Sequence, residues 1–134
     1  MVVSAGRTIL VADESRENRG ALAASLRLRG YSVIEAEDGE EAHRRIREDA
    51  PDLALLGGVL PLRTGIELCM ALKADEGTRA LPVILLSSIT RTVGRTDEHW
   101  RRRTGADAFL SEPYDPRSLF WLIEQFLLPD LQPR

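Results

Sequence analysis

The sequence is short of the residues that build several common kinds of site. It has one cysteine in 134 residues, Cys69, which excludes an intrachain disulfide. Because Cys69 lies in an apolar helical pattern, we interpret it as a buried residue rather than a nucleophile. The two histidines are His43, in a predicted helix, and His99, in an arginine-rich segment. Their placement supports neither a metal-ligand spacing nor a serine-type triad.

Long hydrophobic runs are also absent. No stretch approaches the roughly 20 apolar residues of a membrane-spanning helix, and Met1 to Gly6 is too short for a signal peptide. The chain has 18 basic and 21 acidic residues, a formal net charge of -3 and a pI near 5.4. Binding to nucleic acid through bulk electrostatics is therefore not favoured. We expect a cytoplasmic protein that contacts neither nucleic acid nor a membrane.

What the sequence does contain is a regular alternation of apolar runs and amphipathic stretches. Its length and its 43% of hydrophobic residues suit a single domain, 1–134, with a core from about 8 to 128. We expect strands at Thr8–Ala12, Tyr31–Ala36, Leu53–Leu56, Val83–Leu86 and Ala106–Leu110. We expect helices at Arg16–Arg29, from Asp38-Gly39 to Asp49, at Thr64–Ala74, from about Thr96 to Thr104 and at Pro116–Leu128. This order predicts an α/β protein with a parallel sheet covered on both faces.

The helical spacing of apolar residues also predicts which side chains face the core. In the first helix these are Ala21, Leu22, Leu26 and Leu28. In the second helix they are Ala42 and Ile46. In the third they are Ile66, Leu68, Cys69, Met70 and Leu72.

The chemistry of an open parallel sheet gathers at the carboxyl ends of its strands. The first predicted strand ends in Asp13-Glu14 and the third in Gly57-Gly58. The fourth ends in Ser87-Ser88, and the fifth leads into "SEPYD", where Glu112 precedes Pro113. These four tips are the candidates for a functional site.

Four segments in order, "ILVADESRENR", "PDLALLGGVLP…TGIELC", "PVILLSS" and "GADAFLSEPYD", resemble the receiver domain of two-component response regulators. The resemblance covers roughly Thr8 to Leu128. It implies a flavodoxin-like (βα)5 fold, a doubly wound parallel sheet with strand order 2-1-3-4-5. In that family an aspartate after the third strand attacks a phosphoryl donor. Two acids after the first strand help this aspartate to hold magnesium, while a Ser or Thr and a Lys contact the phosphoryl group.

Carried over residue by residue, the resemblance is incomplete. Asp13 and Glu14 match the acidic pair, Ser87 matches the hydroxyl residue, and Pro113 matches the residue after the lysine. The position of the phosphoacceptor is Gly57, which has no side chain, and the position of the lysine is Glu112, which has the opposite charge. The chain therefore resembles the atypical, or pseudo-receiver, subgroup.

The acidic residues at the tips have more than one interpretation. Asp13 and Glu14 can hold a weakly bound, mostly hydrated Mg²⁺, although we favour a solvated turn that caps the first helix. Glu112 can complete a cluster with them, in which case at least one pKa rises. We favour Glu112 pointing to solvent, or pairing with an arginine such as Arg63 or Arg91.

The segment "RTVGRTDEHWRRR" contains Arg91, Arg95, Arg101, Arg102 and Arg103 around Trp100. Because Asp97 and Glu98 interrupt it, we interpret it as a solvated helix face. In the family, the fourth helix, fifth strand and fifth helix form the usual surface for partners and for dimers. The resemblance thus places a partner or homodimer site on this segment and on Pro116–Leu128. Phe109 matches the family's aromatic switch position, and an ordinary half-buried strand aromatic is an equally good interpretation.

These observations lead to one main functional prediction. We expect a degenerate receiver domain that is not an enzyme, is not phosphorylated on aspartate, and signals through protein–protein contact without a cofactor. The alternative is a module in which the emptied phosphorylation pocket responds to a small ligand or a cation. A hydrolase that uses the acidic residues lacks both a nucleophile and a complete metal site.

Overall fold

A computed structural model describes residues 6–87 and 95–128 of the chain. Its centre is a parallel five-stranded sheet in the order β2-β1-β3-β4-β5, which confirms the predicted flavodoxin-like topology. The strands are β1 (Thr8–Ala12), β2 (Ser32–Ala36), β3 (Leu53–Gly57), β4 (Val83–Ser87) and β5 (Ala108–Ser111). The third strand thus runs one residue further than predicted, to Gly57 itself.

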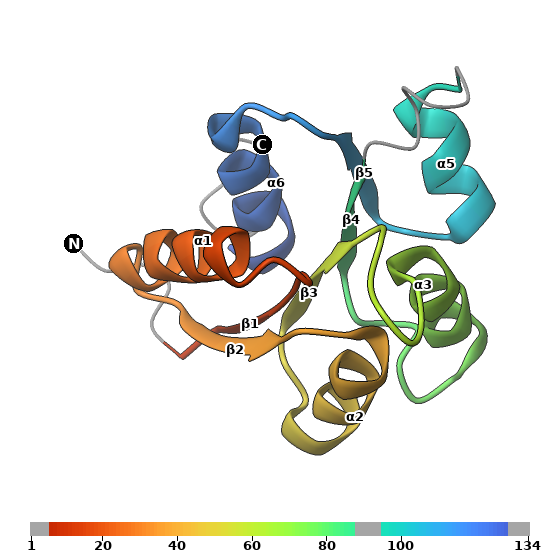
Figure 1. The fold of residues 1–134 in the computed structure, drawn as a ribbon, viewed down its shortest axis with the longest axis horizontal. Coiled ribbons are helices and arrows are strands. Elements are labelled where there is room, and N and C mark those ends of the chain that lie inside the picture. Colours follow the sequence, from red (N-terminus) through yellow and green to blue (C-terminus); the bar gives the residue numbers. More distant parts are fainter. Residues whose placement is uncertain (1–5, 88–94, 129–134) are drawn as a thin grey trace.

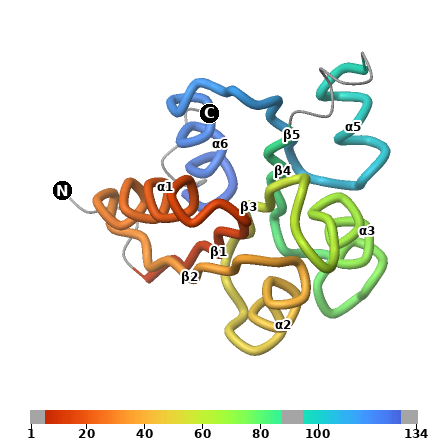
Figure 2. Tube along the Cα trace, in the orientation of Figure 1, coloured from red at the N-terminus to blue at the C-terminus, as the bar shows by residue number. Residues whose placement is uncertain are grey.

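The helices cover both faces of the sheet. They are α1 (Arg16–Leu28), α2 (Gly39–Asp49), α3 (Gly65–Ala74), α5 (Asp97–Thr104) and α6 (Pro116–Leu127). Helices α1 and α6 lie side by side on one face, and α2, α3 and α5 lie on the other (Figure 1). The chain trace in Figure 2 shows that α1 and α6, far apart in the sequence, both flank the centre of the sheet. None of the helices in the described ranges is long and apolar enough to cross a bilayer.

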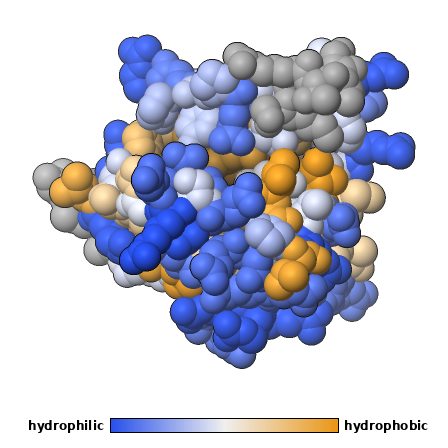
Figure 3. Space-filling view, viewed as in Figure 1, coloured by the Kyte–Doolittle hydropathy of each residue, from blue (hydrophilic) through white to orange (hydrophobic). Residues whose placement is uncertain are grey.

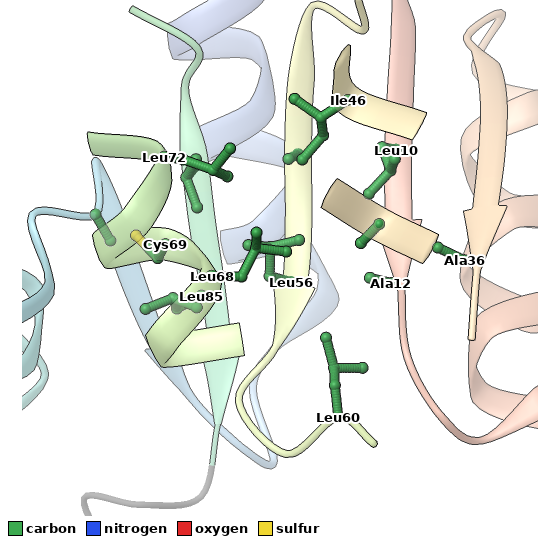
Figure 4. Close-up of a cluster of buried hydrophobic side chains, with 14 of the residues drawn as sticks. Leu10, Ala12, Ala36, Ile46, Leu56, Leu60, Leu68, Cys69, Leu72 and Leu85 are labelled. Carbon is green, nitrogen blue, oxygen red and sulfur yellow. The ribbon is translucent and has the colours of Figure 1, made fainter. Parts of the chain in front are cut away.

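Alternating residues of each strand enter two separate hydrophobic clusters, because successive side chains of a strand point to opposite faces. Leu10, Leu56 and Leu85 pack toward α2 and α3 (Figure 4), together with Cys69. Ile9, Leu55 and Ile84 pack toward α1 and α6. The central strands are therefore apolar except at Thr8 and Ser87 at their ends, which is the pattern of a parallel sheet buried on both faces.

Each helix begins after a residue whose side chain accepts a hydrogen bond from a backbone N–H in the first turn. The five N-cap residues are Ser15, Asp38, Thr64, Thr96 and Asp115. Such caps satisfy backbone donors that would otherwise lack a partner inside the helix. Thr64 and Asp38, which the sequence placed inside or at the start of their helices, lie just outside them.

Three residues expected in the core are exposed instead. Leu28 is 89% exposed and Met70 is 47% exposed, and Ala21 also faces solvent. In α1 the inward residues are Ala23 and Leu26. Side chains two residues apart in a helix point about 200° apart around its axis, so Leu28 points away from the face that Leu26 occupies. Figure 3 shows a hydrophobic area over α3 and the connection leading to it, where the exposed apolar residues are Val59, Leu62 and Met70.

Candidate functional site

The carboxyl ends of β1, β3, β4 and β5 surround a cavity of about 220 Å³, the edge cavity. All four predicted tips contribute to it, so the structure brings the predicted site residues together. The residues that line it are Asp13, Glu14, Ser15, Asn18, Gly57, Gly58, Val59, Ser87 and Glu112. Ser88, which follows β4, lies outside the described residues.

Asp13 is held in place by the chain around it. Its N–H donates to the Ala36 carbonyl at 3.1 Å, and its Oδ1 accepts from the Ser15 N–H at 2.8 Å. The Asp13 carbonyl accepts from Arg19 Nη1 at 2.8 Å, and Arg19 also pairs with Glu35 at 3.2 Å. Asp13 is half-buried whereas Glu14 is exposed. The acidic pair therefore forms the predicted turn before α1, in which Ser15 is the N-cap and Asp13 supports it.

Gly57 leaves room for a side chain beside Asp13. It is the last residue of β3 and pairs with Leu86 of β4. Its φ is outside the left-handed region, so its backbone suits residues other than glycine. A Cβ at this position would lie 3.3 Å from the Ala12 carbonyl oxygen and 3.9 Å from the Asp13 Cα. Backbone geometry therefore does not require glycine at position 57.

Gly58 is different, because a close approach occupies its side-chain direction. Its N–H donates to the Leu86 carbonyl at 2.9 Å, which draws it against β4. A Cβ on Gly58 would overlap the side chain of Ser87, which is buried with 4% exposure. Gly58 and Ser87 thus pack tightly against each other where they line the edge cavity.

Glu112 lies at the other side of the cavity, directly after β5. Its N–H donates to the Ser87 carbonyl at 2.9 Å, and its peptide bond to Pro113 is cis. The half-buried carboxyl has a pKa raised above its usual value, first by burial and then by the negative charge of Asp13. Glu112 is thus half-buried on the same side as Asp13, and does not point freely to solvent as we favoured.

Arg63, one of the two arginines named as alternative partners of Glu112, contacts His43 instead. Arg63 Nη1 lies 2.7 Å from His43 Nδ1 of α2, and Arg47 donates to the other ring nitrogen at 3.2 Å. Burial and these two positive charges lower the pKa of His43. Sequence alone gave no reason to expect His43 as the partner of Arg63, because Arg63 and His43 meet only through the packing of α2 against the loop before α3. Arg91, the other predicted partner, lies outside the described residues.

The acidic residues fall short of a metal site as they stand. Across residues 6–87 and 95–128, no group of three or more His, Cys, Asp or Glu side chains is arranged so that it could hold an ion. Divalent magnesium is usually held by one or two carboxylates together with substrate phosphates and several waters. At this edge one oxygen of Asp13 is already used by a backbone N–H, and Glu14 is exposed.

Phe109 and Cys69 belong to the core rather than to the site. Phe109 is 5% exposed and packs in the cluster that faces α2 and α3, so it is more deeply buried than the half-buried strand aromatic that we expected as one alternative. Cys69 is fully buried, and its Sγ lies 3.7 Å from the Thr104 carbonyl. Its burial confirms the predicted buried residue, and it raises the pKa of the thiol to about 11.

The arginines of α5 are largely paired within their own helix. Glu98 accepts from Arg101 Nη2 at 2.8 Å and from Arg102 Nε at 3.0 Å. These hydrogen bonds hold the pKa of Glu98 at about 2. Arg95 and Arg102 are exposed, in agreement with the predicted solvated helix face.

A second cavity, of about 400 Å³, adjoins the first and was not foreseen from the sequence. We call it the α1–α6 cleft. Asp13, Asn18 and Glu112 line both cavities. Asn18 follows Ser15 by three residues, the spacing of a capped first turn, and this is the only signal that could have indicated it. The other lining residues are Ala21, Leu22, Ser25, Leu86, Pro113, Tyr114, Pro116, Leu119 and Phe120.

The sequence pattern of the response regulator receiver domain matches residues 9–124. The chain is similar to the phosphate regulon transcriptional regulatory protein PhoB of Pseudomonas aeruginosa, with 38% identity over 115 residues that cover 85% of this chain and 48% of PhoB. It is also similar to protein PilH of that organism, with 33% identity over 119 residues that cover 89% of this chain and 96% of PilH. The chain thus spans about half the length of PhoB.

A solved structure shows the same fold. It is the signal receiver domain of a signal transduction histidine kinase from Syntrophus aciditrophicus, with a TM-score of 0.80 and 26% identity. The match covers 96% of each chain.

Proposed function

The chain belongs to the response regulator receiver domain family, and from this premise we propose that it signals through contact with a protein partner without being phosphorylated on aspartate. The observation that carries the proposal is Gly57 at the tip of β3. Gly57 borders the edge cavity beside Asp13. Its backbone conformation is open to residues other than glycine, yet the position carries no side chain. On this proposal the domain is not an enzyme and works in the cytoplasm.

The chemistry of phosphoryl transfer explains why this position matters. An acyl phosphate forms when a carboxylate oxygen attacks the phosphorus, and Gly57, Gly58 and Val59 offer no such oxygen. The incoming group also carries negative charge that a cation normally balances. At this edge Glu112 and Asp13 are both acidic, and the residues lining the edge cavity include no lysine or arginine. We therefore expect weak Mg²⁺ binding at most, and no resident cofactor.

The partner surface on this proposal is formed by α5, β5 and α6, with Arg95 and Arg102 as its charged residues. Arg102 is 77% exposed at its side chain, and Trp121 of α6 is 59% exposed. Tryptophan and arginine are the residue types most often found at the energetic centre of protein interfaces. If the partner is a second copy of this chain, the same surface forms a homodimer.

The test of the proposal is intact-mass analysis after incubation with acetyl phosphate and Mg²⁺ at neutral pH. We expect the protein to keep its mass. An added mass of about 80 Da, that of one phosphoryl group, would overturn the proposal if it were found on the natural sequence.

The matched positive control restores the two residues that the family resemblance implies. Gly57→Asp supplies a nucleophile and a third carboxylate, so it should raise divalent-ion affinity by itself. Glu112→Lys replaces a repulsive charge with a charge-assisted contact. The double variant should take up phosphate better than either single variant. Failure of a folded double variant to bind either magnesium or phosphate would mean that Gly57 and Glu112 do not hold the roles that we assign to them.

A second candidate function is favoured by the cavities themselves. The edge cavity and the α1–α6 cleft share three lining residues, and together they offer space for a ligand where the family holds a phosphoryl group. In that case a small molecule or a cation would bias the same signalling surface. A ligand that binds only the folded state raises the melting temperature, and protein-partner signalling alone would show no such shift.

A further inference from the structure

The α1–α6 cleft has two chemically different ends. Its walls are mostly apolar and come from α1, from the turn after β5 and from α6, chiefly Leu22, Tyr114 and Phe120. At the end that meets the edge cavity stand the carboxylates of Asp13 and Glu112. The two helices that form the walls lie next to each other in Figure 1. A ligand that fills this cleft would need an apolar body and a polar head.

The charge at that end is negative and is not neutralised by the lining residues. Neither cavity is lined by a lysine or an arginine in the part of the chain that the structure describes. Arg19 donates to the backbone carbonyl of Asp13 and pairs with Glu35, and Arg29 stacks on the Phe120 ring at 3.7 Å. Among the described residues, no ion pair or side-chain hydrogen bond reaches the Glu112 carboxylate.

The pKa shifts of two residues that line the cleft follow from the same burial and negative charge. The pKa of Tyr114, which lines the cleft, is raised by burial and then by the charges of Glu112 and Asp13. The pKa of Glu112 is raised by burial and by Asp13. A cation placed between Asp13 and Glu112 would relieve this repulsion.

We propose that the α1–α6 cleft binds a small organic cation, a protonated primary amine with a short apolar chain. The ammonium group lies between Asp13 and Glu112, and the chain lies along Leu22, Tyr114 and Phe120. This inference rests on the second candidate function, in which a ligand in these cavities controls signalling, and it names the chemical class of that ligand. An inorganic cation would use only the acidic end, and a neutral apolar molecule would use only the walls.

The experiment uses hexylamine as the probe and follows chemical shifts of the full chain by NMR titration. Hexanol and hexanoate have the same chain with a neutral and a negative head, and putrescine and Mg²⁺ are cations without an apolar tail. We expect hexylamine to bind more tightly than each of the other four by about tenfold, the factor that one charge-assisted contact or a buried short chain can supply. Equal binding of hexylamine and hexanol, or of hexylamine and putrescine, would overturn the proposal.

Variants separate the two ends of the cleft. Glu112→Gln and Asp13→Asn should each weaken hexylamine by about tenfold and leave hexanol unchanged. Ala21→Phe fills the cleft from an exposed position of α1 and should abolish hexylamine binding. Ala24→Phe is the matched control, because Ala24 is exposed on the same helix but does not line the cleft. Equal effects of the two phenylalanine variants would place the amine elsewhere, and thermal unfolding of each variant shows that it is folded.

The pH dependence gives a further readout with a definite sign. Hexylamine stays protonated over the acidic range, so its binding should weaken as pH falls through the raised pKa of Glu112. In Glu112→Gln this dependence should shrink, and an unchanged pH profile would contradict the assigned ammonium site. If hexylamine fails to bind while intact-mass analysis still shows no phosphorylation, the ligand class is wrong and the proposed function stands. A phosphorylated natural protein would overturn the proposed function independently of amine binding.

Discussion

The interior of the sheet and its carboxyl edge are built under different constraints. In the interior, Leu10, Leu55 and Leu56 are fully buried, and each packs in one of the two hydrophobic clusters. At the edge, Gly57 leaves space beside Asp13, and Glu112 holds a half-buried carboxylate next to another acid. Packing determines which residues suit the interior, whereas the edge keeps features that packing does not require. Features of that second kind indicate function rather than stability.

The largest expected effect comes from breaking the interior. Leu55→Ala removes a fully buried side chain between β3 and the α1–α6 face, and neighbours held in a sheet can fill the gap only in part. We expect the free energy of unfolding to fall by about 2–5 kcal/mol, measured by urea denaturation. A loss below about 1 kcal/mol would mean that this cluster is loosely packed, and the contrast with the edge would fail.

A smaller effect should separate two neighbours at the edge. Gly58→Ala forces a methyl group into the Ser87 side chain and should cost about 1–3 kcal/mol. Gly57→Ala makes one close contact, at 3.3 Å from the Ala12 carbonyl oxygen, and ordinary contacts with Asp13 and Leu60, so it should change stability by less than about 1 kcal/mol. The two variants are unfolded under the same conditions. If Gly57→Ala is the more damaging of the two, glycine at position 57 is a structural requirement and no longer points to function.

The order of the elements was predictable from sequence because it depends on local patterns. Apolar runs such as Leu53–Leu56 and Val83–Leu86 are typical of buried parallel strands, and N-cap residues such as Ser15 mark the helix starts. The convergence of the four strand ends was predictable because the carboxyl ends of parallel strands lie at one edge of the sheet. Asp13, Gly57, Ser87 and Glu112 therefore converge as expected.

What the sequence could not supply were features set by the angle between elements. Leu28 fits the apolar composition of α1 but points away from the sheet, because only the docked helix shows which stripe is buried. Arg63 was assigned to Glu112 by charge alone, and it contacts His43 because α2 packs against the loop before α3. The α1–α6 cleft arises between helices distant in sequence, so no local pattern could reveal it.

A third prediction tests the electrostatic side of the edge. In the folded protein the pKa of Glu112 is raised, so ionised Glu112 opposes folding. This cost is absent below the pKa of the unfolded chain, about 4.3, and grows as pH rises through the folded pKa. Glu112→Gln should therefore be more stable than the natural protein at pH 7, with the difference disappearing near pH 4. Urea denaturation at both pH values measures it, and a destabilised variant at pH 7 would indicate that the carboxylate has a favourable partner.

The smallest expected effect on stability concerns the arginines of α5. Arg102→Glu replaces an exposed residue that pairs with Glu98, and Arg44→Glu on α2 replaces an exposed residue that pairs with Glu48. Exposed ion pairs contribute little, so each variant should shift the melting temperature by less than about 4 °C. Arg102→Glu and Arg44→Glu should differ only in how fast each variant binds a partner. If the partner docks on α5, β5 and α6, Arg102→Glu should slow association in a salt-sensitive way, and Arg44→Glu, on a helix distant from α5 in Figure 1, should not. Equal slowing by both variants would mean that the partner responds to net charge rather than to this surface, and no slowing by either would place the partner on another face of the domain.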